Sequence, residues 1–292
     1  MLRDGVELNE VNIVTRKLGT MKLRSSVMNE DMISSAELSR AACCNLGESF
    51  VTNPSVDVSY SDAATGAKQI KLLGLSGTYV QMLTENIPNY RGAASPYGLG
   101  YVPGPWMQSI QVSKGISSVK NGYEAITGQI NVEFKKPQLL EADWVSANLF
   151  ASSTNRYEAN ADATLKLSKR WSTSLLAHYE NETKAHDGND DGFVDIPQVE
   201  QYNVWNRWAY MGDHYVFQAG FKALSESRTS GQAHHTDMQT GDLYKVGIDT
   251  ERYEFFTKNA YIFNKEKNTN LALILSASWH NPVSYTHLTL PT

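Results

Sequence analysis

The sequence has little cysteine, no long apolar run and no excess of basic charge. Its two cysteines, Cys43 and Cys44, are adjacent, which excludes a disulfide framework and the spaced thiolates of a zinc site. The longest apolar run, residues 271–275, is far shorter than the roughly 18 residues of a membrane-spanning helix, so we exclude such a helix. With 26 Lys and Arg against 31 Asp and Glu and no basic patch, nucleic acid is excluded as a partner.

Aromatic residues are abundant and unevenly distributed along the 292 residues. Nine of the 30 Phe, Trp and Tyr residues lie in residues 1–138, and the other 21 lie in residues 139–292. Hydrophobic residues make up 41% of the chain, which is enough for a core. The uneven distribution predicts two regions in different environments.

The second region alternates between apolar and polar residues, which is typical of strands with two unlike faces. In residues 156–167, every second position from Tyr157 to Leu167 is apolar and the positions between them are polar. Seven segments share this pattern: 142–152, 156–167, 170–181, 201–211, 214–224, 252–264 and 268–280. Each has between ten and thirteen residues. Soluble strands usually have about five or six residues and tilted membrane strands about nine to eleven, so the lengths favour a membrane β-barrel.

The connections between these segments support the same interpretation. Short turns at residues 168–169, 212–213 and 265–267 alternate with long connections at residues 182–200 and 225–251. Outer-membrane barrels have short periplasmic turns and long external loops. A soluble β-sandwich also alternates, and it stays open as the alternative. Seven strands cannot close around a wide polar interior, so we expect further strands and interpret the sequence as a fragment.

Residues 34–137 have the features of a small α+β domain. Ser34 and Glu37 form a capping-box pattern that predicts an amphipathic helix over residues 34–50. Short strand-like segments separated by Gly, Pro and Asn follow, and residues 88–105 form a long Gly, Pro and Tyr-rich loop. Loops of that length in compact domains are usually functional or disordered.

These segments carry a family resemblance. PSVDVSY, IKLLGLSGTYVQMLTENIP and PWMQSIQVSKGISSVKNGYEAITGQINVEFKKP, in that order, resemble the plug domain of TonB-dependent outer-membrane receptors. The resemblance is greatest to siderophore, haem and cobalamin receptors of Bacteroidetes-like bacteria. Leu73-Gly74 departs from the family, which commonly has Arg-Gly there, so no role of that arginine is carried over.

The resemblance implies a plugged barrel of about 22 strands in the outer membrane of a Gram-negative cell. It implies active uptake of a metal chelate such as siderophore-iron, haem or cobalamin. The partners it implies are the TonB–ExbB–ExbD complex, which supplies energy, and the outer-membrane lipid. No covalent chemistry is implied, and no nucleophile with a base, phosphate loop or paired carboxylates indicates an enzyme. The alternatives are a SusC-like importer of glycans or other nutrients, or a β-rich binding module without transport.

Four segments are expected along the chain. Residues 1–33 form an N-terminal extension and residues 34–137 the plug domain. Residues 138–282 form about seven barrel strands. Residues 283–292, VSYTHLTLPT, look like a translated sequencing adapter. Whether an upstream regulatory domain or signal peptide precedes Met1 stays open.

The N-terminal extension contains a segment that resembles a TonB box. The resemblance assigns TonB binding to Glu10, Val11, Asn12, Ile13, Val14 and Thr15. An extended, β-branched segment is able to add as a strand to the sheet edge of a partner. The alternative is an ordinary strand of an upstream domain.

The long connection 182–200 contains a candidate calcium loop. Oxygen-bearing side chains occur at positions that match 1, 3, 5 and 9 of a calcium-binding loop, with Gly192 at position 6. The candidate ligands are Asp187, Asn189, Asp191 and Asp195. Gln198 replaces the usual bidentate Glu and no helices flank the loop, so it is not an EF-hand. No cofactor is required, and the alternative to calcium is a solvated acidic loop.

Two further groups are candidate ligand-binding residues. Tyr90, Arg91, Tyr97 and Tyr101 lie in the long loop of the N-terminal domain, where aromatic rings stack on organic ligands and Arg pairs with anions. Packing of that loop against the barrel wall is the equal alternative. His234 and His235 lie in an expected external loop, where imidazoles ligate metals. Their alternative is simple solvation.

Overall fold

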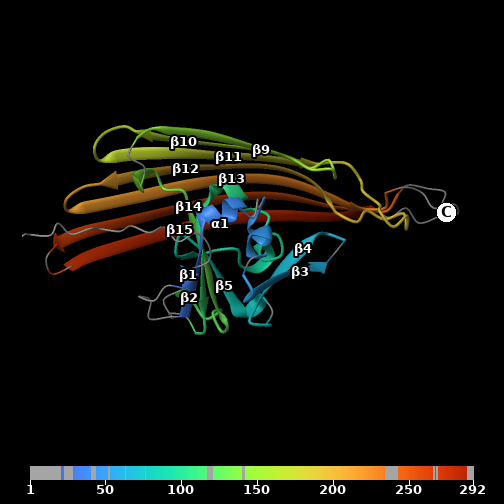
Figure 1. Ribbon diagram of the computed structural model, residues 1–292, viewed down its shortest axis with the longest axis horizontal. Coiled ribbons are helices and arrows are strands. Elements are labelled where there is room, and N and C mark those ends of the chain that lie inside the picture. The colour runs from blue at the N-terminus through green and yellow to red at the C-terminus, as the bar shows by residue number, and fades with distance from the viewer. Residues whose placement is uncertain are drawn as a thin grey trace, which may run out of the picture.

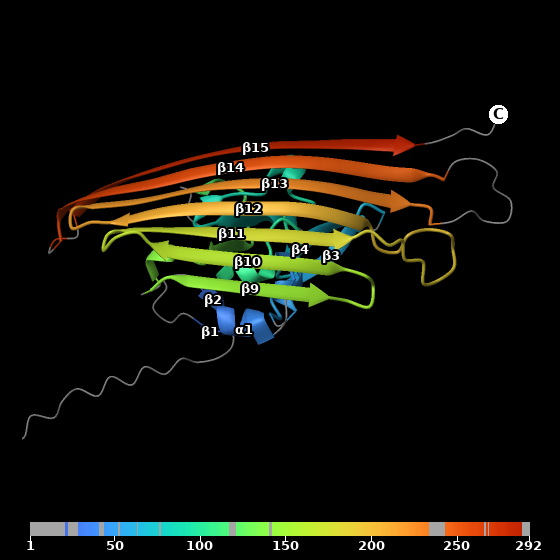
Figure 2. The same cartoon turned by 90° about the horizontal axis from the view of Figure 1, so that it is seen from above.

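The computed structural model contains an N-terminal domain packed beneath a long, curved antiparallel sheet (Figure 1). Figure 2 shows the strands of this sheet running side by side above the domain. The structure describes residues 21–22, 29–40, 44–51, 53–62, 64–75, 77–116, 121–139, 142–233, 243–265, 267 and 269–287. Within these ranges, no helix is long and apolar enough to cross a membrane.

The N-terminal domain is built on a six-stranded sheet with the order β1-β2-β7-β8-β5-β6. Its strands are β1 (Met21–Lys22), β2 (Asn29–Ser34), β5 (Val80–Thr84), β6 (Ile87–Pro88), β7 (Met107–Lys114) and β8 (Gly128–Phe134). The β5–β8 pair is parallel and the other pairs are antiparallel. A separate hairpin consists of β3 (Val56–Asp62) and β4 (Ala67–Leu72). Since β1 and β2 precede Ser35, this sheet begins before the expected domain start at residue 34.

The predicted helix over residues 34–50 is wrong in its length. The helix α1 covers Ser35–Arg40, and the Glu37 amide donates to the Ser34 hydroxyl at 3.4 Å, as the capping-box pattern predicted. A separate 3₁₀ helix, η1, follows at Leu46–Phe50. Asn45 begins this turn as its N-cap, because its side chain accepts from the Glu48 amide at 3.3 Å. The other 3₁₀ turns are η2 (Gly77–Tyr79), η3 (Gly92–Ala94), η4 (Gly104–Trp106) and η6 (Pro137–Leu139).

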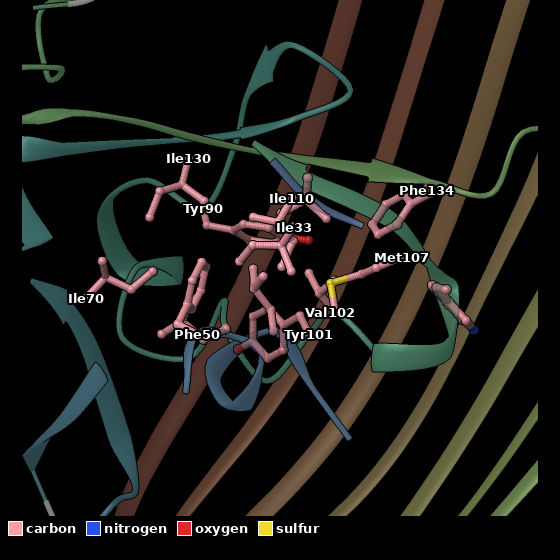
Figure 3. Packing of buried hydrophobic residues seen from close by; sticks show 14 of the residues in the cluster. Ile33, Phe50, Ile70, Tyr90, Tyr101, Val102, Met107, Ile110, Ile130 and Phe134 are labelled. Carbon is pink, nitrogen blue, oxygen red and sulfur yellow. The ribbon is translucent and has the colours of Figure 1, made fainter. Parts of the chain in front are cut away.

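The core lies between the six-stranded sheet, the loops and the large sheet (Figure 3). Ile110, Ile130 and Phe134 of the N-terminal domain are fully buried in it. Four buried residues of the large sheet complete the same cluster: Leu176, Trp205, Leu224 and Phe256. The rings of Phe134 and Trp205 meet edge to face at 5.0 Å. The N-terminal domain and the large sheet, which we call the wall, therefore share one core.

The large sheet confirms all seven predicted strands. They are β9 (Trp144–Ala151), β10 (Tyr157–Lys166), β11 (Trp171–Glu182), β12 (Gln198–Met211), β13 (Tyr215–Gly231), β14 (Lys245–Asn264) and β15 (Thr269–His287). Neighbours in sequence are neighbours in space, and β9 and β15 are its two edges. The expected connection 225–251 is shorter than predicted, because β13 and β14 continue pairing to Gly231 and Lys245. β15 continues to His287, into the segment expected to be an adapter, whose origin stays a prediction.

The wall has polar residues on its buried face and apolar residues on its exposed face, which is the reverse of a soluble protein. In β11, Ser174, His178 and Glu180 point towards the N-terminal domain and are buried, whereas Trp171 and Leu175 on the opposite face are exposed. A soluble sandwich buries its apolar face, so this wall does not match that alternative. Apolar residues outside and polar residues inside are typical of a membrane barrel. We call the end with connections 183–197 and 232–244 the long-loop end, and the other the short-turn end.

Candidate functional site

A cleft of about 280 Å³ lies between the N-terminal domain and the wall, towards the long-loop end. The hairpin β3–β4 contributes Tyr60, Gly66 and Lys68, and the loop that follows η3 contributes Tyr97. The wall contributes a set of polar and charged side chains: Arg156, Glu180, Glu182, Gln201, Glu226 and Arg228. The cleft therefore joins a polar wall to two tyrosines of the domain.

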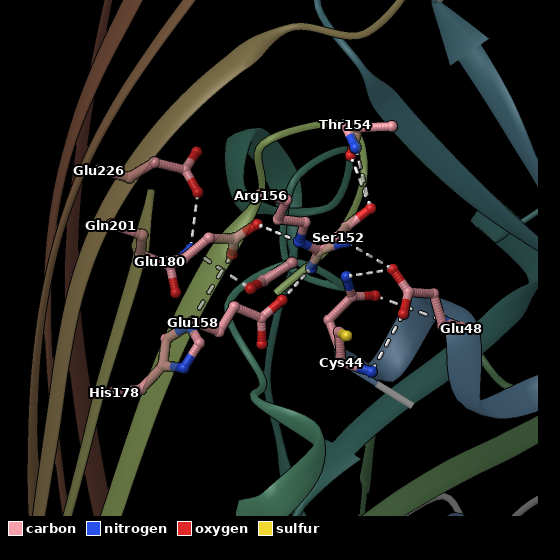
Figure 4. Close-up of polar contacts among 12 residues, drawn as sticks. Cys44, Glu48, Ser152, Thr154, Arg156, Glu158, His178, Glu180, Gln201 and Glu226 are labelled. Atoms are coloured by element: carbon pink, nitrogen blue, oxygen red, sulfur yellow. Dashed lines mark hydrogen bonds and ion pairs between the residues drawn. The ribbon is translucent and has the colours of Figure 1, made fainter. Parts of the chain in front are cut away.

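Arg156 is the centre of one charged network in this cleft (Figure 4). It lies immediately before β10, and its three nitrogens contact Glu48 at 3.0 Å, Glu158 at 2.7 Å and Glu180 at 3.0 Å. Glu48 belongs to η1, so the network connects the domain to the wall. Glu48 also accepts from the Cys44 amide at 3.0 Å, which fixes the start of η1. One guanidinium thus compensates three carboxylates in a site largely removed from water.

Arg228 and Glu226 form a second network across the cleft. Arg228 donates to Glu226 through two nitrogens, at 3.2 and 3.1 Å, and the Gln201 amide donates to the same carboxylate at 2.7 Å. The Arg228 guanidinium lies over the Tyr97 ring at 5.4 Å from its centroid. Since Tyr97 belongs to the domain and Arg228 to β13, this contact also spans the two parts of the molecule.

Lys68 is the cation that the hairpin supplies. Its ammonium lies over the Tyr60 ring at 5.4 Å from the centroid. Burial lowers the pKa of Lys68, while the charge of Glu48 opposes that effect. Tyr60 is 56% exposed, so the open side of its ring faces solvent.

The hairpin approaches the wall closely at Gly66. This residue has φ of +68°, and a Cβ there would lie 2.9 Å from both an Arg228 nitrogen and the Pro197 ring. Glycine therefore meets two requirements: it adopts the left-handed backbone conformation, and it leaves room for Arg228 and Pro197, which a side chain would contact.

The structure separates the four predicted residues of the long loop. Tyr97 lines the cleft, as described above. Tyr90 and Tyr101 are instead 4% and 0% exposed and pack against the wall, where the ammonium of Lys222 lies 3.3 Å from the Tyr90 hydroxyl and 2.8 Å from the Tyr101 carbonyl. Burial raises the pKa of both phenols. Arg91 is turned away towards Glu124, at 2.7 Å.

Glu85 anchors the domain to the wall at a second place. It lies in the tight β5–β6 turn with φ of +56°, and Arg207 of β12 contacts its carboxylate at 2.8 Å. Lys136 and Lys258 lie at 3.6 and 3.8 Å. Burial alone would raise the pKa of Glu85, but the positive charges of Arg207, Lys136 and Lys258 outweigh it and lower that pKa.

Three residues of these networks were not predicted from the sequence: Arg156, Arg228 and Glu85. A signal for the first two existed, because charged residues on the inward face of a barrel strand point at whatever fills the barrel. Their partners were not readable, since Glu48 and Arg156 are 108 residues apart. Glu85 had no such signal, because its three cations come from different strands and segments.

The candidate calcium loop is ordered by its own backbone. Asp187 accepts from the Gly192 amide at 2.8 Å, Asp191 accepts from the Phe193 amide at 2.8 Å, and Asp195 accepts from the Gly188 amide at 2.6 Å. Asn189 accepts from the Asp191 amide at 3.3 Å. Among the described residues, no three His, Cys, Asp or Glu side chains converge as a metal-binding group. The loop as folded is thus closed by Asx turns, and calcium stays a prediction.

Two predicted groups lie outside the described residues. They are the TonB-box-like segment, Glu10 to Thr15, and the histidine pair, His234 and His235.

Comparison with known proteins gives concordant results. Residues 22–129 match the family model of the TonB-dependent receptor plug domain. The vitamin B12 transporter BtuB of Vibrio vulnificus is 24% identical over 185 residues, which is 63% of this chain and 30% of that protein. These relatives are transporters and receptors rather than enzymes.

Solved structures share the fold at low sequence identity. The alcaligin receptor FauA of Bordetella pertussis superposes with a TM-score of 0.69 at 13% identity, covering 90% of this chain and 40% of that one. The ferripyoverdine receptor of Pseudomonas aeruginosa superposes with a TM-score of 0.61 at 12% identity, covering 93% and 45%. This chain spans less than half the length of each of these relatives. Residues 22–129 thus match the TonB-dependent receptor plug domain, and the domain with its adjoining antiparallel strands has the fold of the corresponding parts of these receptors.

Proposed function

We propose that this chain is the plug and first wall strands of an outer-membrane receptor that actively takes up a metal chelate. The cargo class is siderophore-iron, haem or cobalamin. The relatives support this class, because their names specify vitamin B12, alcaligin and ferripyoverdine. The wall supports the location, because its outward face is apolar along β9 to β15. A glycan or other nutrient importer is the less favoured alternative.

The observation that carries the proposal is the domain that occupies the polar face of the wall. Anchors at Glu48–Arg156, Glu85–Arg207 and Asn203–Tyr101 hold it there. A ligand bound in the cleft cannot pass the domain unless the domain moves. A buried charge that loses its partner is costly. Movement of the domain away from the wall therefore needs external energy. The TonB–ExbB–ExbD complex is the proposed source.

The test is uptake by the full-length receptor in its cell. Deletion of the gene is expected to abolish growth on one ferric chelate, haem or cobalamin as limiting source, and the plasmid-borne gene is expected to restore it. Deletion of TonB in the complemented strain should abolish growth again. Unchanged uptake of all three classes after deletion of the receptor gene would overturn the proposal.

TonB is proposed to bind residues 10–15 by strand addition. Main-chain hydrogen bonds would provide the affinity, so a residue without an amide hydrogen in the middle of the segment should prevent pairing. Ile13→Pro is expected to abolish binding of the soluble C-terminal domain of TonB to the receptor, whereas Ile13→Val should not. Equal binding by the proline variant would contradict the assignment.

A further inference from the structure

We propose that Lys68 is the residue that recognises the ligand, by pairing with a negatively charged oxygen-donor group of an iron chelate between Tyr60 and Tyr97. This inference rests on the proposed function and makes it more specific, because it selects anionic chelates over neutral or cationic ones. The groups that present such oxygens are carboxylates and catecholates.

The first argument is the pairing of charges in the cleft. Arg156 is engaged by three carboxylates, and Arg228 is engaged by Glu226. Lys68 differs from both, because it forms no ion pair with any residue that the structure describes. At Arg156 an entering anion would therefore compete with three carboxylates. At Arg228 it would compete with the Glu226 carboxylate, which accepts two hydrogen bonds from the guanidinium. At Lys68 no ion pair has to be broken, although the charge of Glu48, which lines the same cleft, acts on the ammonium.

The second argument is the environment of the ammonium group. Lys68 is half-buried, and burial lowers its pKa, which means that its charge is incompletely solvated. The Tyr60 ring compensates this in part through a cation–π contact at 5.4 Å. A charge-assisted hydrogen bond to an anion is stronger than such a contact, and among the described residues the Lys68 ammonium donates none. An anionic oxygen is therefore the partner that suits this ammonium.

The third argument is the arrangement of aromatic rings around this cation. Tyr60 lies on β3 and Tyr97 on the neighbouring loop, and both line the same cleft as Lys68. Each ring has a cation over it, Lys68 in one case and Arg228 in the other. Two rings and one available ammonium suit a planar ligand arm that ends in anionic oxygens. Such arms are what oxygen-donor iron chelators present.

Glu182 offers a test of the sign of the ligand charge. It is 7% exposed, lines the same cleft from the end of β11, and forms no ion pair within the described part of the chain. A cationic ligand would prefer Glu182, and an anionic one would be repelled by it. The variants Lys68→Gln and Glu182→Gln are therefore expected to act in opposite directions on the same ligand.

The experiment measures equilibrium binding to the detergent-purified full-length receptor by quenching of tryptophan fluorescence. The probes are an anionic ferric tris-catecholate, anionic ferric citrate, a cationic ferric tris-hydroxamate and neutral cyanocobalamin. The variants are Lys68→Gln, Lys68→Arg and Glu182→Gln. The matched control is Lys71→Gln, because Lys71 is on the same strand but does not line the cleft.

The proposal expects the wild-type receptor to bind one of the anionic complexes most tightly. Loss of a charge-assisted hydrogen bond should weaken that binding about ten- to hundredfold in Lys68→Gln. Lys68→Arg and Lys71→Gln should stay within about threefold of wild type, and Glu182→Gln should bind equally or more tightly. The two anionic probes separate a carboxylate from a catecholate ligand.

Three outcomes would overturn the proposal. One is unchanged affinity in Lys68→Gln. Another is tightest binding of the cationic or neutral probe, with loss in Glu182→Gln, and this would leave the proposed uptake function standing. The third is absence of binding of any probe together with unchanged uptake in the gene deletion, which removes the proposed function itself. Heat-induced mobility shifts on gels show for every variant that the receptor is folded.

Discussion

The Glu85 carboxylate of the plug lies 2.8 Å from the Arg207 guanidinium of the wall, and both side chains are at most 2% exposed. Their positions are 122 residues apart in sequence, so the pair exists only when plug and wall are assembled. Glu85 also accepts from the Phe134 amide at 3.0 Å. The ion pair therefore indicates whether the domain is packed against the wall.

Replacing this carboxylate should loosen the plug. Glu85→Gln leaves Arg207 buried without its counter-charge, which costs about 3–5 kcal/mol in comparable buried pairs. The free energy of plug unfolding by urea in detergent is the quantity to measure. The matched control is Glu124→Gln, which removes the partly exposed Arg91 pair and should cost at most about 1 kcal/mol. Equal effects of the two variants would contradict the role of the buried pair.

The same pair predicts a pH dependence of stability. The pKa of Glu85 is lower in the folded receptor than in the unfolded chain, because the neighbouring cations outweigh burial. The unfolded chain therefore binds the proton more readily, so stability is present above the carboxyl's ordinary pKa and is lost as pH falls through the folded pKa. Urea titrations between neutral and strongly acidic pH should show this loss in wild type and a smaller one in Glu85→Gln. A wild-type slope no steeper than that of the variant would argue against it.

Two adjacent leucines distinguish a lipid-facing wall from a soluble one. Leu175 is 46% exposed on the outer face, and Leu176 is 1% exposed in the core. If the outer face meets lipid, Leu175→Arg should destabilise the receptor by about 2–4 kcal/mol near the bilayer centre. On a soluble surface the same change would stay within about 0.5 kcal/mol.

The control for this variant is Ser227→Arg, which is outward-facing but close to the long-loop end of β13. Its effect should be about zero to 1 kcal/mol, since charges near the interface are tolerated. Folding into lipid vesicles with a urea titration gives both values. A harmless Leu175→Arg would remove the membrane interpretation of the wall.

Calcium is expected to replace the backbone partners of the acidic loop. Because Asp187, Asp191 and Asp195 accept from amides in the folded loop, binding requires these carboxylates to turn towards a shared ion. We expect terbium luminescence, excited through Phe193 or a nearby Tyr, to saturate at or below about millimolar concentration and to be competed by calcium. Asp191→Asn together with Asp195→Asn should abolish it. No saturable signal in the wild-type receptor would leave a solvated loop.

The hairpin contact at Gly66 predicts a change in the cleft without loss of the fold. An alanine there has to adopt φ of +68° and clashes with Arg228 and Pro197 at 2.9 Å. The strain should cost about 1–2 kcal/mol and displace the Arg228 guanidinium from Tyr97. Chelate affinity should therefore fall in Gly66→Ala, whereas the midpoint of urea unfolding should fall by a similar small amount in this variant and in its control. Gly74→Ala is the control, because its φ is +83° but nothing lies within 4 Å of the added Cβ.

The strands were predictable from the sequence because their signal is local. A period-2 pattern extends over each strand, so β9 to β15 were all found. Their long-loop ends were less predictable, since both faces of β13 are polar there, and in β14 Val246 and the buried Ile248 place apolar residues on the inward face instead of the outward one. The continuation to Gly231 and Lys245 is determined by pairing instead.

The site was less predictable because its residues are brought together by the tertiary fold. Tyr97 was identified from loop composition, yet Tyr90 and Tyr101 have the same composition signal and pack in the core. Tyr90 and Tyr101 instead contact Lys222, which lies on a strand distant in sequence. No spacing in the sequence contains that information.

Leu176, Trp205, Leu224 and Phe256 interrupt an otherwise hydrophilic inner surface. When the plug is displaced, these side chains become wet, at a cost of about 1.5–3 kcal/mol for each fully exposed one. This free-energy cost disappears when the domain returns to its place, so it favours the return. Under the proposed transport function, these apolar residues would therefore favour return of the domain to its place against the wall, where the charged pairs form again.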